Sequence, residues 1–206
     1  MEERLSEMNT ELERLADEIV DMLEALPMVR KCTLCGSLAQ GTADERSDID
    51  IDVDVSGYDK GRFMLEVPEL LKDKLNIVCV DFAPSLIPEK CIVSLAFDEQ
   101  NPYRVVDINC CAEPAGTVVT ADQARRLNNR YAHMIKLWTA NWKHFIRGRE
   151  CRSDILRMVQ KIGIPGAQTK TESALLEETL CWLEQSAEAR YQGIIASCRR
   201  LFDHQK

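Results

Sequence analysis

Four aspartates stand two residues apart in the stretch SDIDIDVDVS, at positions 48, 50, 52 and 54. The residues between them are isoleucine or valine, whose β-branched side chains favour a strand with one buried face. Because side chains alternate between the two faces of a strand, all four carboxylates lie on the opposite face. Neighbouring carboxylates are then roughly 6.6 Å apart. The spacing predicts either a solvated acidic face or a site at which carboxylates bind a cation.

A glycine and a serine precede this strand, and ten residues separate them from its first aspartate. Gly36 and Ser37 follow the stretch VRKCTLC, which is itself predicted to be a strand. A small residue and a hydroxyl at a strand end leave backbone N–H groups available to bind a phosphate. Asp48 and Asp50 share one face of the next strand, and a pair of carboxylates prefers Mg²⁺ or Mn²⁺ over zinc. The arrangement therefore predicts a metal ion that bridges the phosphates of a nucleotide.

The pattern of GS, ten further residues and DID resembles the motif of the nucleotidyltransferase superfamily. This superfamily includes DNA polymerase β, terminal uridylyltransferases, poly(A) polymerases and antibiotic adenylyltransferases. The resemblance implies that an NTP is the donor substrate and that Mg²⁺ or Mn²⁺ is the cofactor. It also implies that Asp48 and Asp50 are catalytic metal ligands, and that Gly36 and Ser37 bind the terminal phosphates.

The chemistry of this superfamily needs a third carboxylate, which helps bind the catalytic metal and accepts the proton of the attacking hydroxyl. Asp81 in NIVCVDFA and Asp107 in YRVVDINCC both stand in predicted strands. Minimal nucleotidyltransferases carry this residue soon after the motif, which favours Asp81. Template-independent polymerases and cyclic-nucleotide synthases carry it later, and we favour Asp107 because further segments resemble that group. Asp52 and Asp54 lie beyond the motif, and we interpret them as solvated charges or as support for the metal ligands.

Two later segments resemble helices of the template-independent polymerases and cyclic-nucleotide synthases. NNRYAHMIKLWTANW looks like a helix whose lysine, here Lys136, binds the triphosphate, and TESALLEETLCWLE looks like a later helix of the same group. Lys136 is equally consistent with a solvated lysine on an amphipathic helix. Leu38 is a departure, because minimal and antibiotic-modifying members often have arginine there. KHFIRGRECRSDILRMV is similar to a helix of streptomycin- and lincosamide-type adenylyltransferases, in which Glu150 would lie near the acceptor.

Helices and strands elsewhere in the sequence must position these residues. Residues 2–26 have apolar side chains at helical spacing, which Pro27 ends, and residues 59–75 predict a second helix that contains Pro68. Strands are predicted at 29–35, 48–55, 76–82, 91–97 and 103–111, and the loop FDEQNPY makes the last two an antiparallel hairpin. The periodicity then becomes helical, with one long helix over 121–147 and further helices near 152–162, 172–187 and 188–202. We therefore predict an α+β fold, in which a mixed nucleotidyltransferase-type sheet with flanking helices (residues 1–117) precedes a helical C-terminal lobe (residues 118–206).

Charge is unevenly distributed along the chain, whose net charge is −8. Residues 1–60 carry 16 acidic and 6 basic residues, whereas residues 125–170 carry 11 basic and 2 acidic residues. We expect the two lobes to form a cleft that holds metal ions and phosphates. A basic lobe repels a polycationic aminoglycoside and attracts a nucleotide or an RNA 3′ end.

Composition places the chain among soluble globular proteins, since 45% of the residues are apolar and 29% are charged. Neither a signal peptide nor a membrane span is expected, because the N-terminal stretch is acidic and no apolar run is long enough. The cysteines are odd in number (nine) and lack the spacing of a zinc ribbon, which favours reduced thiols. We therefore expect a cytoplasmic protein with no membrane partner.

Together these features predict an enzyme that moves a nucleoside monophosphate from an NTP to a hydroxyl of a nucleotide or RNA acceptor and releases pyrophosphate. Asp48, Asp50 and Asp107 are the predicted catalytic metal ligands, and Gly36, Ser37 and Lys136 the predicted nucleotide-binding residues. A small-molecule, antibiotic-type adenylyltransferase is an alternative that the chain length and the RGRE segment favour. A catalytically idle nucleotide-binding regulator is a second alternative. The base of the NTP, whether ATP, UTP or another, is left open.

Overall fold

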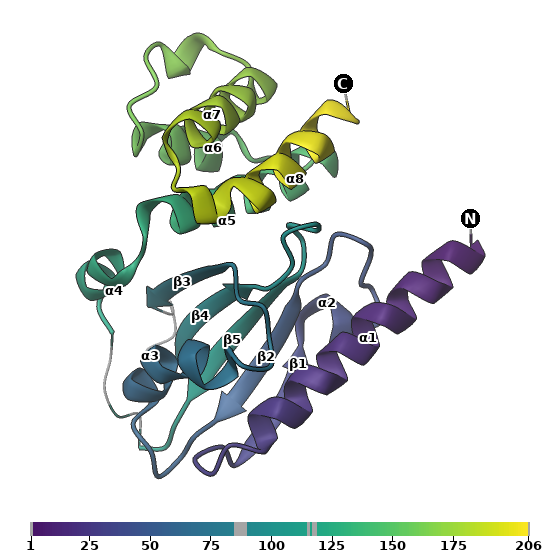
Figure 1. Ribbon diagram of the computed structural model, residues 1–206, viewed down its shortest axis with the longest axis vertical. Coiled ribbons are helices and arrows are strands. Elements are labelled where there is room, and N and C mark those ends of the chain that lie inside the picture. Colours follow the sequence, from purple (N-terminus) through teal and green to yellow (C-terminus); the bar gives the residue numbers. More distant parts are fainter. Residues whose placement is uncertain (1, 85–89, 115, 117–118, 206) are drawn as a thin grey trace. The chain divides into compact units, whose positions relative to one another are not determined.

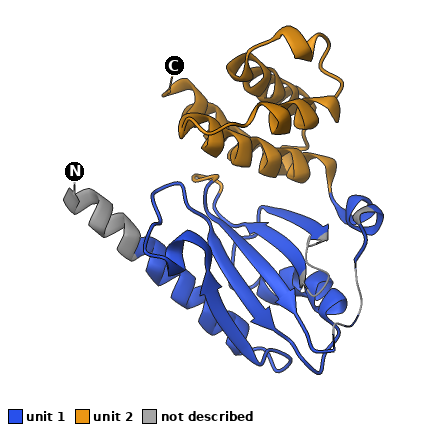
Figure 2. Ribbon diagram, turned by 180° about the vertical axis from the view of Figure 1, so that it is seen from behind, with its two compact units in different colours: residues 1–98, 103–128 blue, residues 99–102, 129–206 orange. Residues whose placement is uncertain are grey.

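The computed structural model describes residues 2–84, 90–114, 116 and 119–205. The chain divides into two compact units (Figure 2). The first consists of Met1–Asp98 and Tyr103–Asn128, and the second of Glu99–Pro102 and Asn129–Lys206. All nine cysteines are free thiols. None of the helices in the described part of the chain has both the length and the apolar character needed to cross a bilayer.

A five-stranded mixed sheet forms the centre of the first unit. Its strands are β1 (Lys31–Cys35), β2 (Ile49–Asp54), β3 (Cys79–Pro84), β4 (Lys90–Ala96) and β5 (Val105–Cys111), in the order β1-β2-β5-β4-β3. The central pair β2 and β5 is parallel, and the other pairs are antiparallel. The predicted strands and the antiparallel β4–β5 hairpin are confirmed.

One face of this sheet carries the core. Ile49, Ile51 and Val53 of β2 are fully buried, and they pack in one apolar cluster with side chains of α1 (Glu2–Glu24) and α3 (Lys60–Leu71). Both helices cover the same face of the sheet (Figure 1). Pro68 lies inside α3 without ending it. The aspartates of β2 therefore point to the opposite face, as the alternation predicts.

The predicted long helix over 121–147 is wrong, because the structure has two helices there, α4 (Ala121–Leu127) and α5 (Arg130–Ile146). Asn128 leaves the helical conformation, and its side-chain amide accepts a hydrogen bond from the N–H of Phe82 at 2.7 Å and donates one to the carbonyl of Phe82 at 2.8 Å. Asn129 then caps α5 by accepting the N–H groups of Tyr131 and Ala132. These bonds attach α4 to β3, so that α4 belongs to the first unit and not, as predicted, to the helical lobe.

The second unit is helical. It contains α5, α6 (Arg152–Gln160), α7 (Glu172–Ser186) and α8 (Gln192–Asp203), with short 3₁₀ turns at Ala167–Thr169 and Ala189–Tyr191. Trp138 of α5 is fully buried, and its indole N–H donates to the carbonyl of Leu176 on α7 at 3.0 Å. The mixed sheet with flanking helices, followed by helices, confirms the predicted α+β fold class.

Candidate active site

Two aspartates from distant parts of the sequence are direct partners on the central parallel strands. Asp50 of β2 pairs with Asp107 of β5, so their side chains leave the same face of the sheet. Neighbouring strands are about 4.8 Å apart, and carboxylates at that spacing can share one cation. Both residues are partly exposed. The structure therefore brings together two of the three carboxylates that the sequence predicts.

Asp81 lies in the same row, but farther along it. The register runs from Asp50 through Asp107 and Ser94 to Asp81, because Ser94 of β4 pairs with Asp107 and Asp81 of β3 pairs with Ser94. Two strand spacings, about 10 Å, separate Asp81 from Asp107, and three separate it from Asp50. Asp81 is also buried, with 4% of its surface exposed. Of the two candidates for the third carboxylate, Asp107 is thus the one adjacent to Asp50.

The glycine of the motif lies against the first of these carboxylates. Gly36 begins the four-residue helix α2 (Gly36–Ala39) with a φ of +65°, a conformation that favours glycine. A Cβ atom at this position would lie 2.0 Å from Oδ2 of Asp50. The carbonyl of Ser37 accepts the N–H of Thr42 at 2.9 Å, which closes the turn after the motif. The glycine is required here because the backbone approaches Asp50 too closely for any side chain.

A hydrogen-bonded turn precedes Asp48, and the side-chain bonds that close it were not predicted from the sequence. The carboxylate of Asp44 accepts the N–H of Arg46 at 2.9 Å and the hydroxyl of Ser47 at 3.1 Å, while the Ser47 oxygen accepts the N–H of Asp44. Ser47 is buried, with 4% of its surface exposed. An aspartate three residues before a serine is a turn signal that the sequence contains. The turn fixes the chain immediately before Asp48, which is partly exposed and precedes the first residue of β2.

The last two aspartates of β2, Asp52 and Asp54, make contacts with neighbouring residues. Asp52 accepts a hydrogen bond from the thiol of Cys35, with a sulfur–oxygen distance of 3.6 Å. Asp54 accepts the N–H of Ser56 at 2.8 Å. Hydrogen bonds from the Ser56 side chain and N–H, together with the nearby charge of Arg30, hold the pKa of Asp54 below its ordinary value of 3.8. Asp54 therefore has a structural role at the end of β2.

The carboxylate oxygens of Asp50 and Asp107 suit a magnesium ion. Mg²⁺ is typically bound by one or two carboxylates and completes its coordination with waters and substrate phosphates. Asp50 and Asp107 supply two carboxylates in register, and Gly36 leaves the space beside Asp50 free of a side chain. Among the residues that the structure describes, no three His, Cys, Asp or Glu side chains form a group able to hold a metal ion by themselves. The pair consequently fits an ion that shares its coordination with a triphosphate.

Comparison with known proteins decides the family. The sequence model described as "Nucleotidyltransferase domain" matches residues 3–107, about half of the chain, a range that includes the GS pair, Asp48, Asp50 and Asp107. The chain belongs to the nucleotidyltransferase family. No curated protein sequence matches this nucleotidyltransferase.

Two solved structures are similar to this one at low sequence identity. The structure of the GLD-2/RNP-8 complex is 14% identical over 98% of this chain and 63% of that chain, with a TM-score of 0.41. A structure of Cid1 with its short product ApU is 17% identical over 72% of this chain and 38% of that chain, with a TM-score of 0.36. This nucleotidyltransferase thus spans less than two thirds of the length of either. A likeness at these scores carries no argument about activity.

Lys136 lies on α5, in the second unit of this nucleotidyltransferase, and is partly exposed. Its neighbours on the helix, Met134, Ile135 and Trp138, are buried. Lys136 lies at the border of the buried side of the helix, because Ala132 and Thr139, one turn before and after it, are buried. Its contact with a triphosphate stays a prediction.

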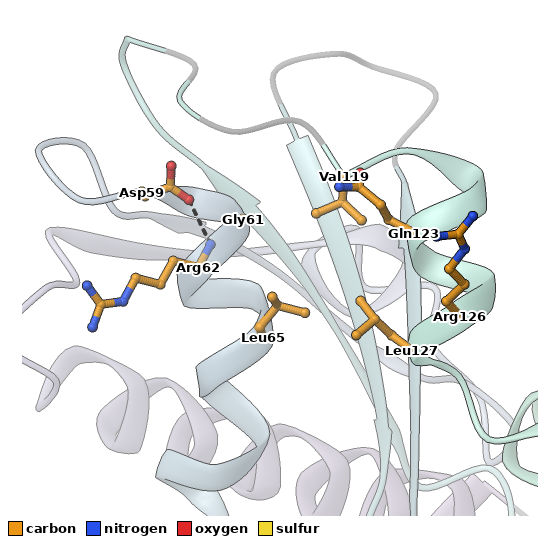
Figure 3. A pocket seen from close by; sticks show the side chains of 8 residues that line it. All are labelled: Asp59, Gly61, Arg62, Leu65, Val119, Gln123, Arg126 and Leu127. Atoms are coloured by element: carbon orange, nitrogen blue, oxygen red, sulfur yellow. Dashed lines mark hydrogen bonds between the residues drawn. The ribbon is translucent and has the colours of Figure 1, made fainter.

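A separate cavity of about 650 Å³ lies between α3 and α4 in the first unit of this nucleotidyltransferase. Figure 3 shows Leu65 of α3 facing Val119 and Leu127 across it, with the side chains of Arg62 and Arg126 on its outer sides. Leu65 and Leu127 remain 43% and 46% exposed. None of the site residues predicted from the sequence lines this cavity. The site at Asp50 and Asp107 is therefore in a different place in the fold.

Proposed function

We propose that this nucleotidyltransferase transfers a nucleoside monophosphate from an NTP to a hydroxyl of a nucleotide or RNA acceptor and releases pyrophosphate. The observation that supports this best is the pairing of Asp50 with Asp107 on adjacent parallel strands, with Gly36 against the Asp50 carboxylate. Two carboxylates on one face of the sheet, beside a turn that lacks a side chain, suit a metal-bound triphosphate.

The proposed reaction is an in-line displacement at the α-phosphorus. The acceptor oxygen forms a bond to this phosphorus while the bond to the oxygen bridging toward the β-phosphate breaks, and pyrophosphate leaves. The hydroxyl proton passes to Asp107, the carboxylate adjacent to Asp50. Asp48, Asp50 and Asp107 would hold Mg²⁺ or Mn²⁺, which would supply positive charge to the triphosphate and to the leaving pyrophosphate. Gly36 and Ser37 bind the terminal phosphates through the backbone of α2, and Lys136 supplies a positive charge to them.

The charge distribution supports a phosphate-bearing acceptor. Residues 125–170 carry 11 basic and 2 acidic residues, and Arg125 and Arg157 are the basic partners in salt bridges to Asp122 and Asp154. Part of this positive charge is therefore compensated, and part serves the triphosphate. The remainder still favours an anionic acceptor over an aminoglycoside, which is a polycation.

The test is incubation of the purified chain and Mg²⁺ with each labelled NTP and a panel of RNA 3′ ends, nucleotides and aminoglycosides. We expect labelled nucleotide to join an RNA end or a nucleotide, with release of pyrophosphate. Asp50→Asn should abolish this transfer. Asp54→Asn is the matched control, because it removes a carboxylate from the same strand and face but keeps an oxygen that can accept the Ser56 N–H.

Three outcomes contradict the proposed reaction or the proposed site. Transfer to an aminoglycoside in preference to RNA or nucleotides indicates the small-molecule adenylyltransferase that the RGRE segment suggests. Binding of NTP and Mg²⁺ without pyrophosphate release from any pair indicates the idle regulator. Equal activity of Asp50→Asn and Asp54→Asn would show that the carboxylate row is not the catalytic site.

A further inference from the structure

We propose that Ser94 is a positioning residue, which holds the Asp107 carboxylate in the orientation that the transfer reaction requires. This inference rests on the proposed function of Asp107. The Ser94 hydroxyl donates a hydrogen bond to Oδ1 of Asp107. Ser94 and Asp107 are direct partners on the antiparallel strands β4 and β5. The serine thus lies on one side of Asp107, and Asp50 lies on the other.

The hydrogen bond gives the two oxygens of the Asp107 carboxylate different roles. The hydrogen bond from Ser94 is made to Oδ1 of Asp107 and not to Oδ2. A carboxylate fixed through one oxygen retains the other for a metal ion or for the proton of the acceptor hydroxyl. Rotation about the terminal side-chain torsion of an aspartate is otherwise broad. The bond therefore restricts a torsion that decides where Oδ2 points.

Water is a poor substitute for this hydroxyl. Ser94 is buried, with 3% of its surface exposed. Its hydroxyl carries one proton, which is donated to Asp107. This hydrogen bond joins β4 to the carboxylate that lies beside Asp50. Removing the hydroxyl leaves Asp107 without this fixed donor.

The experiment compares Ser94→Ala, which removes the donor, with Ser94→Thr, which keeps a hydroxyl on a β-branched residue suited to a strand. Ser197→Ala is the matched control, because Ser197 is a buried serine (1% exposed) on α8 whose hydroxyl donates to the carbonyl of Glu99. Each variant is assayed for kcat and for KM of the NTP. Mn²⁺ binding in the presence of a non-hydrolysable NTP analogue is measured by electron paramagnetic resonance, and folding by thermal melting.

For Ser94→Ala we expect kcat to fall about 10- to 100-fold and Mn²⁺ affinity to fall by a similar order, as for other residues that orient metal ligands. KM for the NTP should change by less than about threefold, because Ser94 does not contact the nucleotide. Ser94→Thr should recover most of both quantities, and Ser197→Ala should match the wild type in both.

The outcomes separate this inference from the proposed function. A folded Ser94→Ala with wild-type kcat and Mn²⁺ affinity overturns the positioning role while transfer stands. Weaker Mn²⁺ binding by Ser94→Ala in a protein that transfers no nucleotide supports the positioning role and contradicts the proposed reaction. If Ser94→Ala fails to fold, the kinetics of Ser94→Thr and Ser94→Cys are compared instead to test the positioning role. Kinetic equality of these two variants contradicts the inference, because a thiol is a much weaker donor than a hydroxyl.

Discussion

The backbone of Gly36 and the carboxylate of Asp50 occupy adjoining space, so that a Cβ atom on residue 36 would lie 2.0 Å from Oδ2 of Asp50. Residue 36 follows the end of β1, and residue 50 lies near the start of the neighbouring strand β2. The two halves of the sequence motif are thus in direct contact in the folded chain. This contact explains in steric terms why the first residue of the motif has no side chain.

Gly36→Ala should therefore lower the activity of the enzyme. Gly41→Ala is the matched control, because Gly41 has the same φ of +65° but a Cβ atom added there would meet no described atom within 4 Å. Both substitutions incur the cost of a left-handed backbone, about 1–2 kcal/mol of unfolding free energy. Only Gly36→Ala also displaces the Asp50 carboxylate, and we expect its activity to fall at least about tenfold more. Urea unfolding and initial rates of transfer measure the two effects, and equal rates for the two variants would contradict the steric explanation.

Asp107→Asn and Asp81→Asn distinguish the two candidates for the third carboxylate. Asp107 is adjacent to Asp50, whereas Asp81 is buried and two strands farther from it than Asp107 is. We expect Asp107→Asn to lower kcat at least about 100-fold, an order typical of loss of a catalytic base. Asp81→Asn should retain most of kcat. A rapid quench assay of single turnovers measures the chemical step, and the reverse ranking would assign the role to Asp81.

Salt should weaken the acceptor interaction if the acceptor is a nucleic acid. Binding that neutralises two or three phosphates of a single strand loses roughly tenfold in affinity between 50 and 200 mM salt. We expect the apparent KM for an RNA acceptor to rise by this order over a KCl series. A dinucleotide acceptor, with fewer phosphates, serves as the control and should show a shallower slope. The same slope for both would mean that the RNA chain is not bound beyond its end.

Asp54 should make stability depend on pH in the acid range. Its pKa in the folded protein is held below 3.8, chiefly by hydrogen bonds from Ser56, so the unfolded chain takes up the proton at higher pH than the folded chain. The stabilisation is fully present above pH 3.8 and is lost as the pH falls through the lowered pKa. Asp54→Asn lacks this pH-dependent contribution. We expect the difference in unfolding free energy between wild type and Asp54→Asn to be larger at pH 6 than at pH 2.5, as measured by urea unfolding.

The local parts of the site could be read from the sequence, because they depend on short spacings. Alternating aspartate and β-branched residues indicated β2 and its two faces, and both are confirmed by the burial of Ile49, Ile51 and Val53. The strand, turn and strand around Gly36 also follow from neighbouring residues. In contrast, the choice between Asp81 and Asp107 depends on strand order, and no local pattern specifies that β5 lies beside β2. The support of Asp107 by Ser94 depends on the same long-range register.

The break between α4 and α5 was missed for a related reason. Apolar spacing continues through residues 121–147, so periodicity alone predicts one helix. Two consecutive asparagines interrupt it, and asparagine competes for backbone hydrogen bonds and favours helix caps. Asn129 acts as such a cap, but the partner of Asn128 is a strand residue 46 positions earlier in the chain. Only the folded structure supplies that partner.

The bonds between Asn128 and Phe82 also have a consequence for self-association. β3 is an edge strand of the sheet, and an edge strand presents unpaired N–H and C=O groups to which another chain can add. The Asn128 amide accepts the Phe82 N–H and donates to the Phe82 carbonyl, as a neighbouring strand would. A second chain that extended the sheet at β3 would first have to displace this side chain. One asparagine at the end of α4 thus blocks the middle of the exposed edge against intermolecular strand addition.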